Sequence, residues 1–178
     1  MDRRLALSAL SAPFAALLAA PAKTLASGDP TAMDDALPLF AIVDRLVDAR
    51  PLTATATGKA VGGALAPNGT RSTEHVLIYE ARGLADFSRV ELRLQGPKSA
   101  DDGQFLLLDV DAKRCIGTDA VQGRYGRQPE LSVPTPRQPP DSPVYLKYRH
   151  DWGTLSFGFA RTDAECLVQV VLDVAASK

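Results

Sequence analysis

The sequence predicts an α+β domain with a mostly antiparallel sheet, one N-terminal amphipathic helix packed on one sheet face, and a short second helix. Three observations predict this class. Apolar residues recur at helical spacing around residue 43, and several later segments alternate apolar and polar side chains as half-buried strands do. The turns between consecutive strands are short, which favours antiparallel pairing. A chain of 178 residues fits one domain.

Residues 1–26 have the pattern of a cleavable export signal, which leaves residues 27–178 as the single domain. Arg3 and Arg4 precede an apolar run over residues 5–20, and small residues allow cleavage after Ala22 or Ala26. The apolar run is too short to span a bilayer comfortably. We therefore expect a bacterial periplasmic or secreted protein with no membrane span.

The export route has two candidates. The adjacent arginines, the leucines after them and Lys23 resemble a twin-arginine signal, but the Ser or Thr that usually precedes the pair is missing. We therefore expect Sec export, with twin-arginine export as the alternative.

The charge balance argues against nucleic acid as a partner. The chain has 20 basic and 21 acidic side chains, and residues 27–178 retain 17 and 20 of them, a net charge of about −3. A basic footprint for a polyanion is not expected from this composition.

The N-terminal helix is the most clearly patterned element. Asp34 or Asp35 is expected to cap it, Pro38 lies in its first turn, and Pro51 ends it. Its apolar stripe consists of Leu39, Ile42, Val43, Leu46 and Val47.

Strands are expected to follow. Alternating Thr53, Thr55 and Thr57 predict a half-exposed edge strand, and residues 67–69 predict a turn. Further strands are expected over residues 75–81, 89–95 and 105–110, the last as a central strand covered on both sides. The strand over 89–95 alternates, with one apolar face and one wet face that carries Arg89, Glu91, Arg93 and Gln95.

The C-terminal part contains the remaining elements. Thr118 is expected to cap a short helix that ends at Tyr125 and is closed by Gly126. A Pro-rich loop covers residues 128–143, with six prolines between 129 and 143. Three closing strands are expected over residues 144–150, 155–159 and 166–174. No internal repeat is evident.

The two cysteines predict a structural disulfide. In an oxidising compartment Cys115 and Cys166 have only one intramolecular connectivity. Reduced core thiols or a redox-active pair are the alternatives, but there is no C-x-x-C spacing and no histidine near either cysteine in sequence.

Sequence motifs for metals and cofactors are missing. His75 and His150 lack the spacing of a zinc site, and the glycines at 58, 62 and 63 match neither a phosphate loop nor a dinucleotide fingerprint. There is no G-x-S-x-G elbow. We expect no metal site and no cofactor.

Two acidic and histidine features could support hydrolysis of an envelope polymer. Asp109 and Asp111 share one face of a strand end, and His150 precedes Asp151. A hydrolase would need His150 as acid or base together with one of Asp109, Asp111 or Asp151. The simpler interpretations are a solvated strand end and a tight turn with Trp152 packed over the sheet.

A cluster of arginines and tyrosines flanks the Pro-rich loop, and such residues are favoured at protein interfaces. The candidate partner-binding residues are Arg124, Tyr125, Arg127, Tyr145, Lys147, Tyr148, Arg149 and Trp152. We therefore expect a binding or inhibitory module that recognises a protein of the cell envelope. The alternatives are the hydrolase above, an ordinary solvated strand face, and a carrier of a small apolar ligand between helix and sheet.

Overall fold

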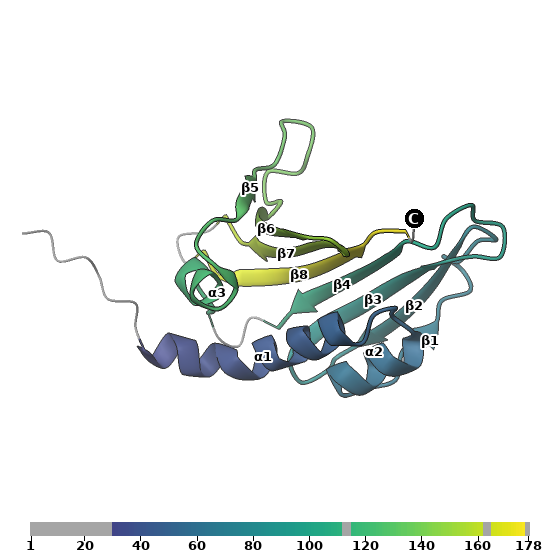
Figure 1. The fold of residues 1–178 in the computed structure, drawn as a ribbon, viewed down its shortest axis with the longest axis horizontal. Coiled ribbons are helices and arrows are strands. Elements are labelled where there is room, and N and C mark those ends of the chain that lie inside the picture. Colours follow the sequence, from purple (N-terminus) through teal and green to yellow (C-terminus); the bar gives the residue numbers. More distant parts are fainter. Residues whose placement is uncertain (1–29, 112–114, 162–164, 177–178) are drawn as a thin grey trace, which may run out of the picture.

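The computed structural model describes residues 30–111, 115–161 and 165–176. They form three helices and one eight-stranded, wholly antiparallel sheet (Figure 1), which confirms the α+β class. The expected export signal, residues 1–26, lies outside the described residues. Within the described part, no helix is long and apolar enough to cross a membrane.

The helices are α1 (Pro30–Asp48), α2 (Ala54–Val61) and α3 (Thr118–Tyr125). The strands are β1 (Ala66–Pro67), β2 (Val76–Arg82), β3 (Phe87–Gln95), β4 (Gln104–Val110), β5 (Glu130–Ser132), β6 (Val144–His150), β7 (Gly153–Phe159) and β8 (Leu167–Val174).

The sheet consists of two consecutive meanders joined at its centre. Its strand order is β1-β2-β3-β4-β8-β7-β6-β5, so β4 and β8 form the central pair. A helix precedes each meander: α2 begins the unit Ala54–Val110, and α3 begins the unit Thr118–Val174. Each unit is 57 residues long. The structure thus repeats one order of elements, although the sequence gives no evident repeat.

Helix α1 presents the predicted apolar stripe to the core. Leu39, Val43 and Leu46 are at most 5% exposed. The helix starts at Pro30, so Asp34 and Asp35 lie within it and do not precede it as caps. Proline is well tolerated in a first turn, where its missing N–H has no helical partner, and this favours the earlier start.

The predicted threonine strand is wrong, because these residues form α2. Thr53 is the N-cap, with its hydroxyl accepting a hydrogen bond from the Ala56 N–H at 3.1 Å, and Gly62 closes the helix with a φ of 79°. The alternating threonines hid a capping residue followed by alanines, which are strong helix formers. Thr57 is fully buried in this helix.

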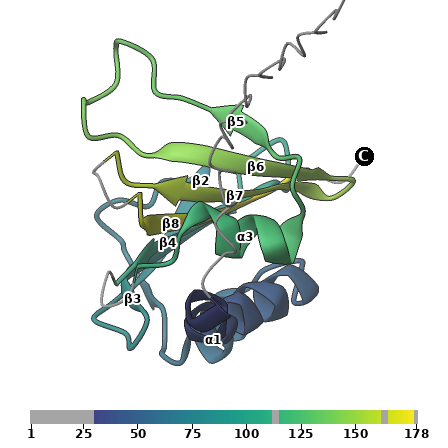
Figure 2. The same ribbon diagram turned by 90° about the vertical axis from the view of Figure 1, so that its left-hand side faces the viewer.

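The three helices lie on the same side of the sheet (Figures 1 and 2). Strand β4 is central, as predicted, but it is covered on one side only. Leu106 and Leu108 are fully buried towards the helices, whereas Phe105 and Leu107 on the other side are half-buried. We call the side away from the helices the open face.

The core lies between the helices and the sheet, and aromatic rings connect α1 to the second unit within it. Phe40 of α1 packs edge-on against Phe157 of β7 and Tyr125 of α3, with ring centroids 6.5 and 5.5 Å apart. Such aromatic pairs each contribute about 0.5–1.5 kcal/mol beyond the area they bury. These side chains fill the space between α1 and the sheet.

Cys115 and Cys166 form the predicted disulfide. It joins the segment after β4 to the residue before β8, which are neighbouring strands. Disulfides are typical of oxidising compartments. With a sequence separation of 51, the bridge encloses α3 and β5–β7 and stabilises the fold by about 4 kcal/mol in the chain-entropy treatment.

Candidate functional site

In the first unit, the open face carries a closed charge network. Glu91 of β3 is fully buried, yet it points to this face and accepts hydrogen bonds from Arg71 at 2.6 Å and from Arg93 at 2.6 Å. Arg89 lies 3.7 Å from the same carboxylate, and Arg71 also pairs with Glu80 of β2. Arg71 belongs to the β1–β2 loop, so this loop is folded back onto the sheet.

The network controls the ionisation of Glu91. Burial alone would raise the pKa of this carboxyl, but the hydrogen bonds and charges of Arg71 and Arg93 outweigh it and lower the pKa to about 2. Glu91 therefore stays ionised, and its charge is neutralised within the protein.

A hydrogen-bonded row continues from this network across the sheet. Asp109 accepts from Arg89 at 2.8 Å and from Gln169 at 2.9 Å, and Gln169 accepts from the Tyr145 hydroxyl. Tyr145 reaches β8 by lying over Gly158, where a Cβ atom would come within 2.7 Å of its ring. Burial, and then the charge of Asp109, raise the pKa of Tyr145. These polar groups are engaged with one another.

The second unit ends in an edge of different character, which we call the loop-bearing edge: β5, the β5–β6 loop (residues 133–143) and the open-face residues of β6. The loop stands away from the sheet (Figures 1 and 2). Turns with hydrogen bonds from Gln138 to Thr135 and from Ser142 to Pro139, both 3.0 Å, order it internally. Its six flanking and internal prolines limit its freedom further.

Apolar and basic side chains are exposed on the loop-bearing edge. Leu131 and Val133 are 61% and 63% exposed. Arg149 donates to Glu130 at 2.7 Å, and this bond is the main reason that the pKa of Glu130 is lowered. Large exposed apolar side chains next to charged ones are typical of a recognition surface.

The structure divides the predicted arginine and tyrosine cluster between two faces. Tyr145, Lys147 and Arg149 point to the open face, as their register with Gly158, Ser156 and Thr154 requires, and Arg127 is exposed near β5. On the helix side, Arg124 forms an ion pair with Asp44 of α1, and the Tyr125 hydroxyl donates to the same carboxylate at 3.1 Å.

The helix-side members of the cluster hold α3 and β6 in place. Burial, followed by the charge of Asp44, raises the pKa of Tyr125. The Tyr148 hydroxyl donates to the Gly126 carbonyl at 3.0 Å. Arg124, Tyr125 and Tyr148 are thus engaged in internal contacts.

Trp152 lies in the turn between β6 and β7, as expected for a residue packed over the sheet. Its ring stacks on His150 with centroids 4.9 Å apart, and the Arg50 guanidinium lies 4.0 Å from its centroid. Arg50 follows α1, so this stack connects the end of the N-terminal helix to the β6–β7 turn. Cation–π contacts of this kind contribute about 0.5–1 kcal/mol at exposed sites.

The structure does not bring together the residues that a hydrolase would need. Through the register, His150 aligns with Gln104 on the helix side, whereas Asp109 lies on the open face, five residues further along. Five residues of strand span roughly 17 Å. Asp111 follows β4, further from His150 still.

Asp151 follows His150 directly, but no hydrogen bond joins them in the described structure. The His150 ring stacks on Trp152 instead. No observation on these residues favours the hydrolase over the binding module.

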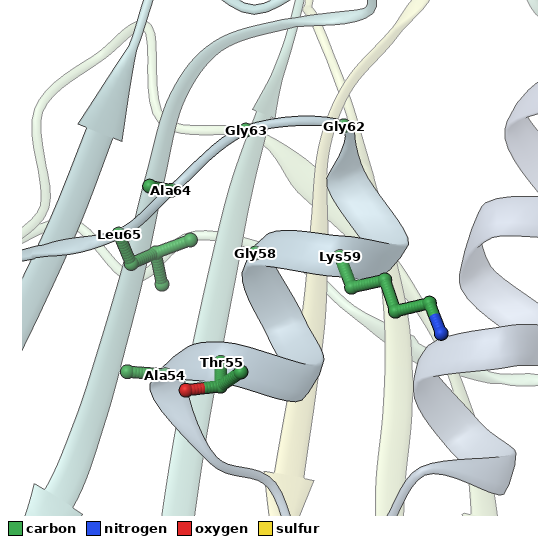
Figure 3. Close-up of a pocket in the computed structure, with 8 residues that line it drawn as sticks. All are labelled: Ala54, Thr55, Gly58, Lys59, Gly62, Gly63, Ala64 and Leu65. Atoms are coloured by element: carbon green, nitrogen blue, oxygen red, sulfur yellow. The ribbon is translucent and has the colours of Figure 1, made fainter.

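Surface hollows offer little to a small ligand. A hollow of about 520 Å³ lies beside α2 and the glycines that follow it (Figure 3). Lys59 extends away from these glycines towards α1. A Cβ atom at Gly58 would approach the Gly63 carbonyl oxygen to 2.6 Å, so this glycine is explained by close backbone packing. A second, smaller hollow of about 200 Å³ lies at the strand ends near Phe105 and Arg93.

The sequence patterns did not predict two features of the sheet. Alternation assigned Glu91 to a solvated strand face, because it gives no information on a distant arginine that covers it. Leu131 and Val133 lie in a segment without apolar periodicity, so their exposure became visible only once β5 was placed at the edge of the sheet.

Among the described residues, no group of three or more His, Cys, Asp or Glu side chains could hold a metal ion. Comparisons of the chain with protein-family models, curated proteins and solved structures give no match. The function is therefore inferred from this chain's own residues.

Proposed function

We propose that this protein is an exported binding or inhibitory module that recognises another protein of the cell envelope through its loop-bearing edge. The observation that carries the proposal is the ordered Pro-rich loop, which stands off the sheet beside exposed Leu131 and Val133. A loop already ordered by turns and prolines loses less entropy on binding than a flexible one. The cysteine bridge and the pattern of residues 1–26 support export by the Sec or twin-arginine route.

The loop-bearing edge suits recognition through side chains better than backbone pairing of a partner strand with β5. Strand β5 has three residues, and Pro134 and Pro136 follow it closely. Proline cannot donate a ladder hydrogen bond, and short edge strands resist pairing with another chain. The binding contacts are therefore made by side chains of β5, of the loop and of the open face of β6.

Site-specific photo-crosslinking tests this proposal. A photoreactive phenylalanine analogue replaces Val133 in one variant and Leu37 in a matched control, because Leu37 of α1 is also exposed, at 48%. Both are expressed as the full-length chain in the cell that makes the protein. We expect the residue 133 variant to form a discrete adduct with one protein, and the residue 37 variant to form none. No adduct at residue 133, or equal adducts at both sites, would contradict the proposal.

A further inference from the structure

We infer that the partner presents an acidic recess that receives the loop-bearing edge, with carboxylates on the wall that meets the basic side chains and an apolar opposite wall. This inference rests on the proposed function and names the chemistry of the partner. It comes from a comparison of the two units, which place different side chains at equivalent positions of the open face.

The equivalence of the two units can be followed in sequence and register. Residues 106–110 read LLLDV and residues 170–174 read VVLDV, 64 positions apart, and they occupy the same part of β4 and of β8. Leu107 pairs directly with Val171. The antiparallel central pair therefore relates the two units by an approximate two-fold axis through these residues.

Outward from this axis, the first equivalent position carries a charged residue in the first unit and a small residue in the second. Leu107 pairs with Glu91 of β3, whereas Val171 pairs with Ser156 of β7. Glu80 of β2 lies opposite Glu91, and Lys147 of β6 lies opposite Ser156. The first unit has two carboxylates along this line, whereas the second has a hydroxyl and an ammonium group.

This difference explains why the two equivalent loops behave differently. In the first unit, Arg71 of the β1–β2 loop is held against the sheet by Glu80 and Glu91. The β5–β6 loop also carries an arginine, Arg137, but the sheet beneath it offers no equivalent carboxylate. Within the described residues Arg137 forms no ion pair, and the loop stands away from the sheet.

The segment that contains the loop-bearing edge, from residue 127 to the end of β7 and Arg161, has a net charge opposite to that of the rest of the domain. Residues 127–161 contain five basic and three acidic side chains, a net charge of +2. The rest of residues 27–178 contains 12 basic and 17 acidic side chains, a net charge of −5. A partner with carboxylates facing Arg127, Arg137 and Lys147 would be attracted to this edge and repelled elsewhere.

The apolar residues define the remaining part of the partner surface. Leu131 pairs with Leu146 and so projects from the helix side of β5, whereas Lys147 lies on the open face. A recess that receives this edge of the sheet therefore contacts the apolar side chains on one wall and the basic side chains on the other. In protein interfaces, buried apolar anchors contribute most of the affinity, and rim charges chiefly set the association rate and its salt dependence.

Binding kinetics with the purified partner identified by the residue 133 adduct test the inference. Arg127→Glu/Arg137→Glu reverses one charge just before the loop-bearing edge and one within its loop. Lys59→Glu/Arg82→Glu makes the same change in net charge on the first unit and serves as the control. We expect the first pair to slow association at least about tenfold and to flatten its salt dependence, and the control pair to change it less than about twofold. Val133→Asp should accelerate dissociation at least about tenfold.

The outcomes separate this inference from the proposed function. Equal slowing by both charge-reversal pairs, or an effect of neither, would overturn the acidic recess while leaving protein binding intact. An unchanged dissociation rate for Val133→Asp would overturn the apolar wall. An adduct of residue 133 with lipid or nucleic acid, or no adduct, would overturn both the inference and the proposed function.

Discussion

The β1–β2 and β5–β6 loops occupy equivalent places in the two units, yet one is part of the sheet surface and the other projects from it. In the first loop, Arg71 donates a hydrogen bond to buried Glu91. In the second loop, Arg137 has no such partner, because Ser156 and Lys147 occupy the positions equivalent to Glu91 and Glu80. Charged side chains on the same open face therefore have different roles in the two units. In the first unit they form a buried ion-pair network that stabilises the fold, whereas in the second the described residues form only the exposed pair of Arg149 with Glu130 and leave Arg137 without an ion pair.

The ion-pair geometry supports this distinction. The Glu91 side chain is 1% exposed, while Arg71, Arg89 and Arg93 around it are 42%, 30% and 44% exposed. The pair of the second unit, Arg149 with Glu130, is 71% and 48% exposed. Exposed pairs contribute at most about 1 kcal/mol, whereas breaking a buried pair costs about 3–5 kcal/mol.

The largest expected effect is on both units together. Cys115→Ser/Cys166→Ser should lower the free energy of unfolding by about 4 kcal/mol, because the enclosed segment gains freedom in the unfolded state. Urea unfolding followed by far-ultraviolet circular dichroism and by Trp152 fluorescence measures it. Coincident transitions are expected, since the pairing of β4 with β8 joins the units in one sheet. Separate transitions would show that the units unfold independently.

Next in size is the loss of the buried carboxylate. Glu91→Gln should lower the free energy of unfolding by roughly 2 kcal/mol at neutral pH, less than for a fully buried pair because the arginines are partly hydrated. Ser156→Ala, at the equivalent position of the second unit, should change it by less than about 0.5 kcal/mol. If the two substitutions cost the same in urea unfolding, the contrast between the units is wrong.

The same carboxylate sets a pH dependence. The folded pKa of Glu91 is about 2, below its ordinary value of 4.5, so its contribution is complete above pH 4.5 and is lost as the pH falls towards 2. The difference in stability between wild type and Glu91→Gln should therefore shrink over this interval. A constant difference from pH 5 to pH 2 would contradict the lowered pKa.

Local sequence patterns predicted most of this fold, because they report on side-chain burial within one element. They predicted the α1 stripe, the extent of α3 and its closing Gly126, the alternation of β3, the closing strands and the disulfide. The expected cap of α3 was wrong, because Gly117 is the N-cap and Thr118 is the first residue of the helix. They failed for α2, where alternating threonines concealed an N-cap, and for β1 and β5, which are too short for a periodic pattern.

The organisation of the candidate site depended on strand order, which no local pattern contains. The predicted arginine and tyrosine residues were close in sequence, but alternation along β6 placed Tyr148 and Tyr145 on opposite faces. The pairing of β4 with β8 created the equivalence of Glu91 and Ser156. Only long-range pairing could reveal that one loop arginine has a carboxylate beneath it and the other does not.

A smaller effect is expected from the loop arginines themselves. Arg71→Ala should raise the pKa of Glu91 by removing a donor and a charge from a buried carboxylate, so the protein should unfold at a higher pH during acid titration. Arg137→Ala should leave the acid midpoint unchanged. Circular dichroism between pH 6 and pH 2 compares them, and an equal shift for both would show that Arg71 has no special role.

The smallest effect on stability is expected from shortening the β5–β6 loop. Removing residues 134–139 reduces it from 11 to five residues, which lowers the entropy of loop closure by about 0.6–0.7 kcal/mol, while the loss of three internal prolines has the opposite sign. The net change should lie within about 0.5 kcal/mol. Removing residues 69–72 from the β1–β2 loop should instead destabilise the fold clearly, because Arg71 is lost with them. Urea unfolding of both deletions measures the contrast. A strongly destabilised β5–β6 deletion would show that this loop, too, is part of the fold and not a surface kept for a partner.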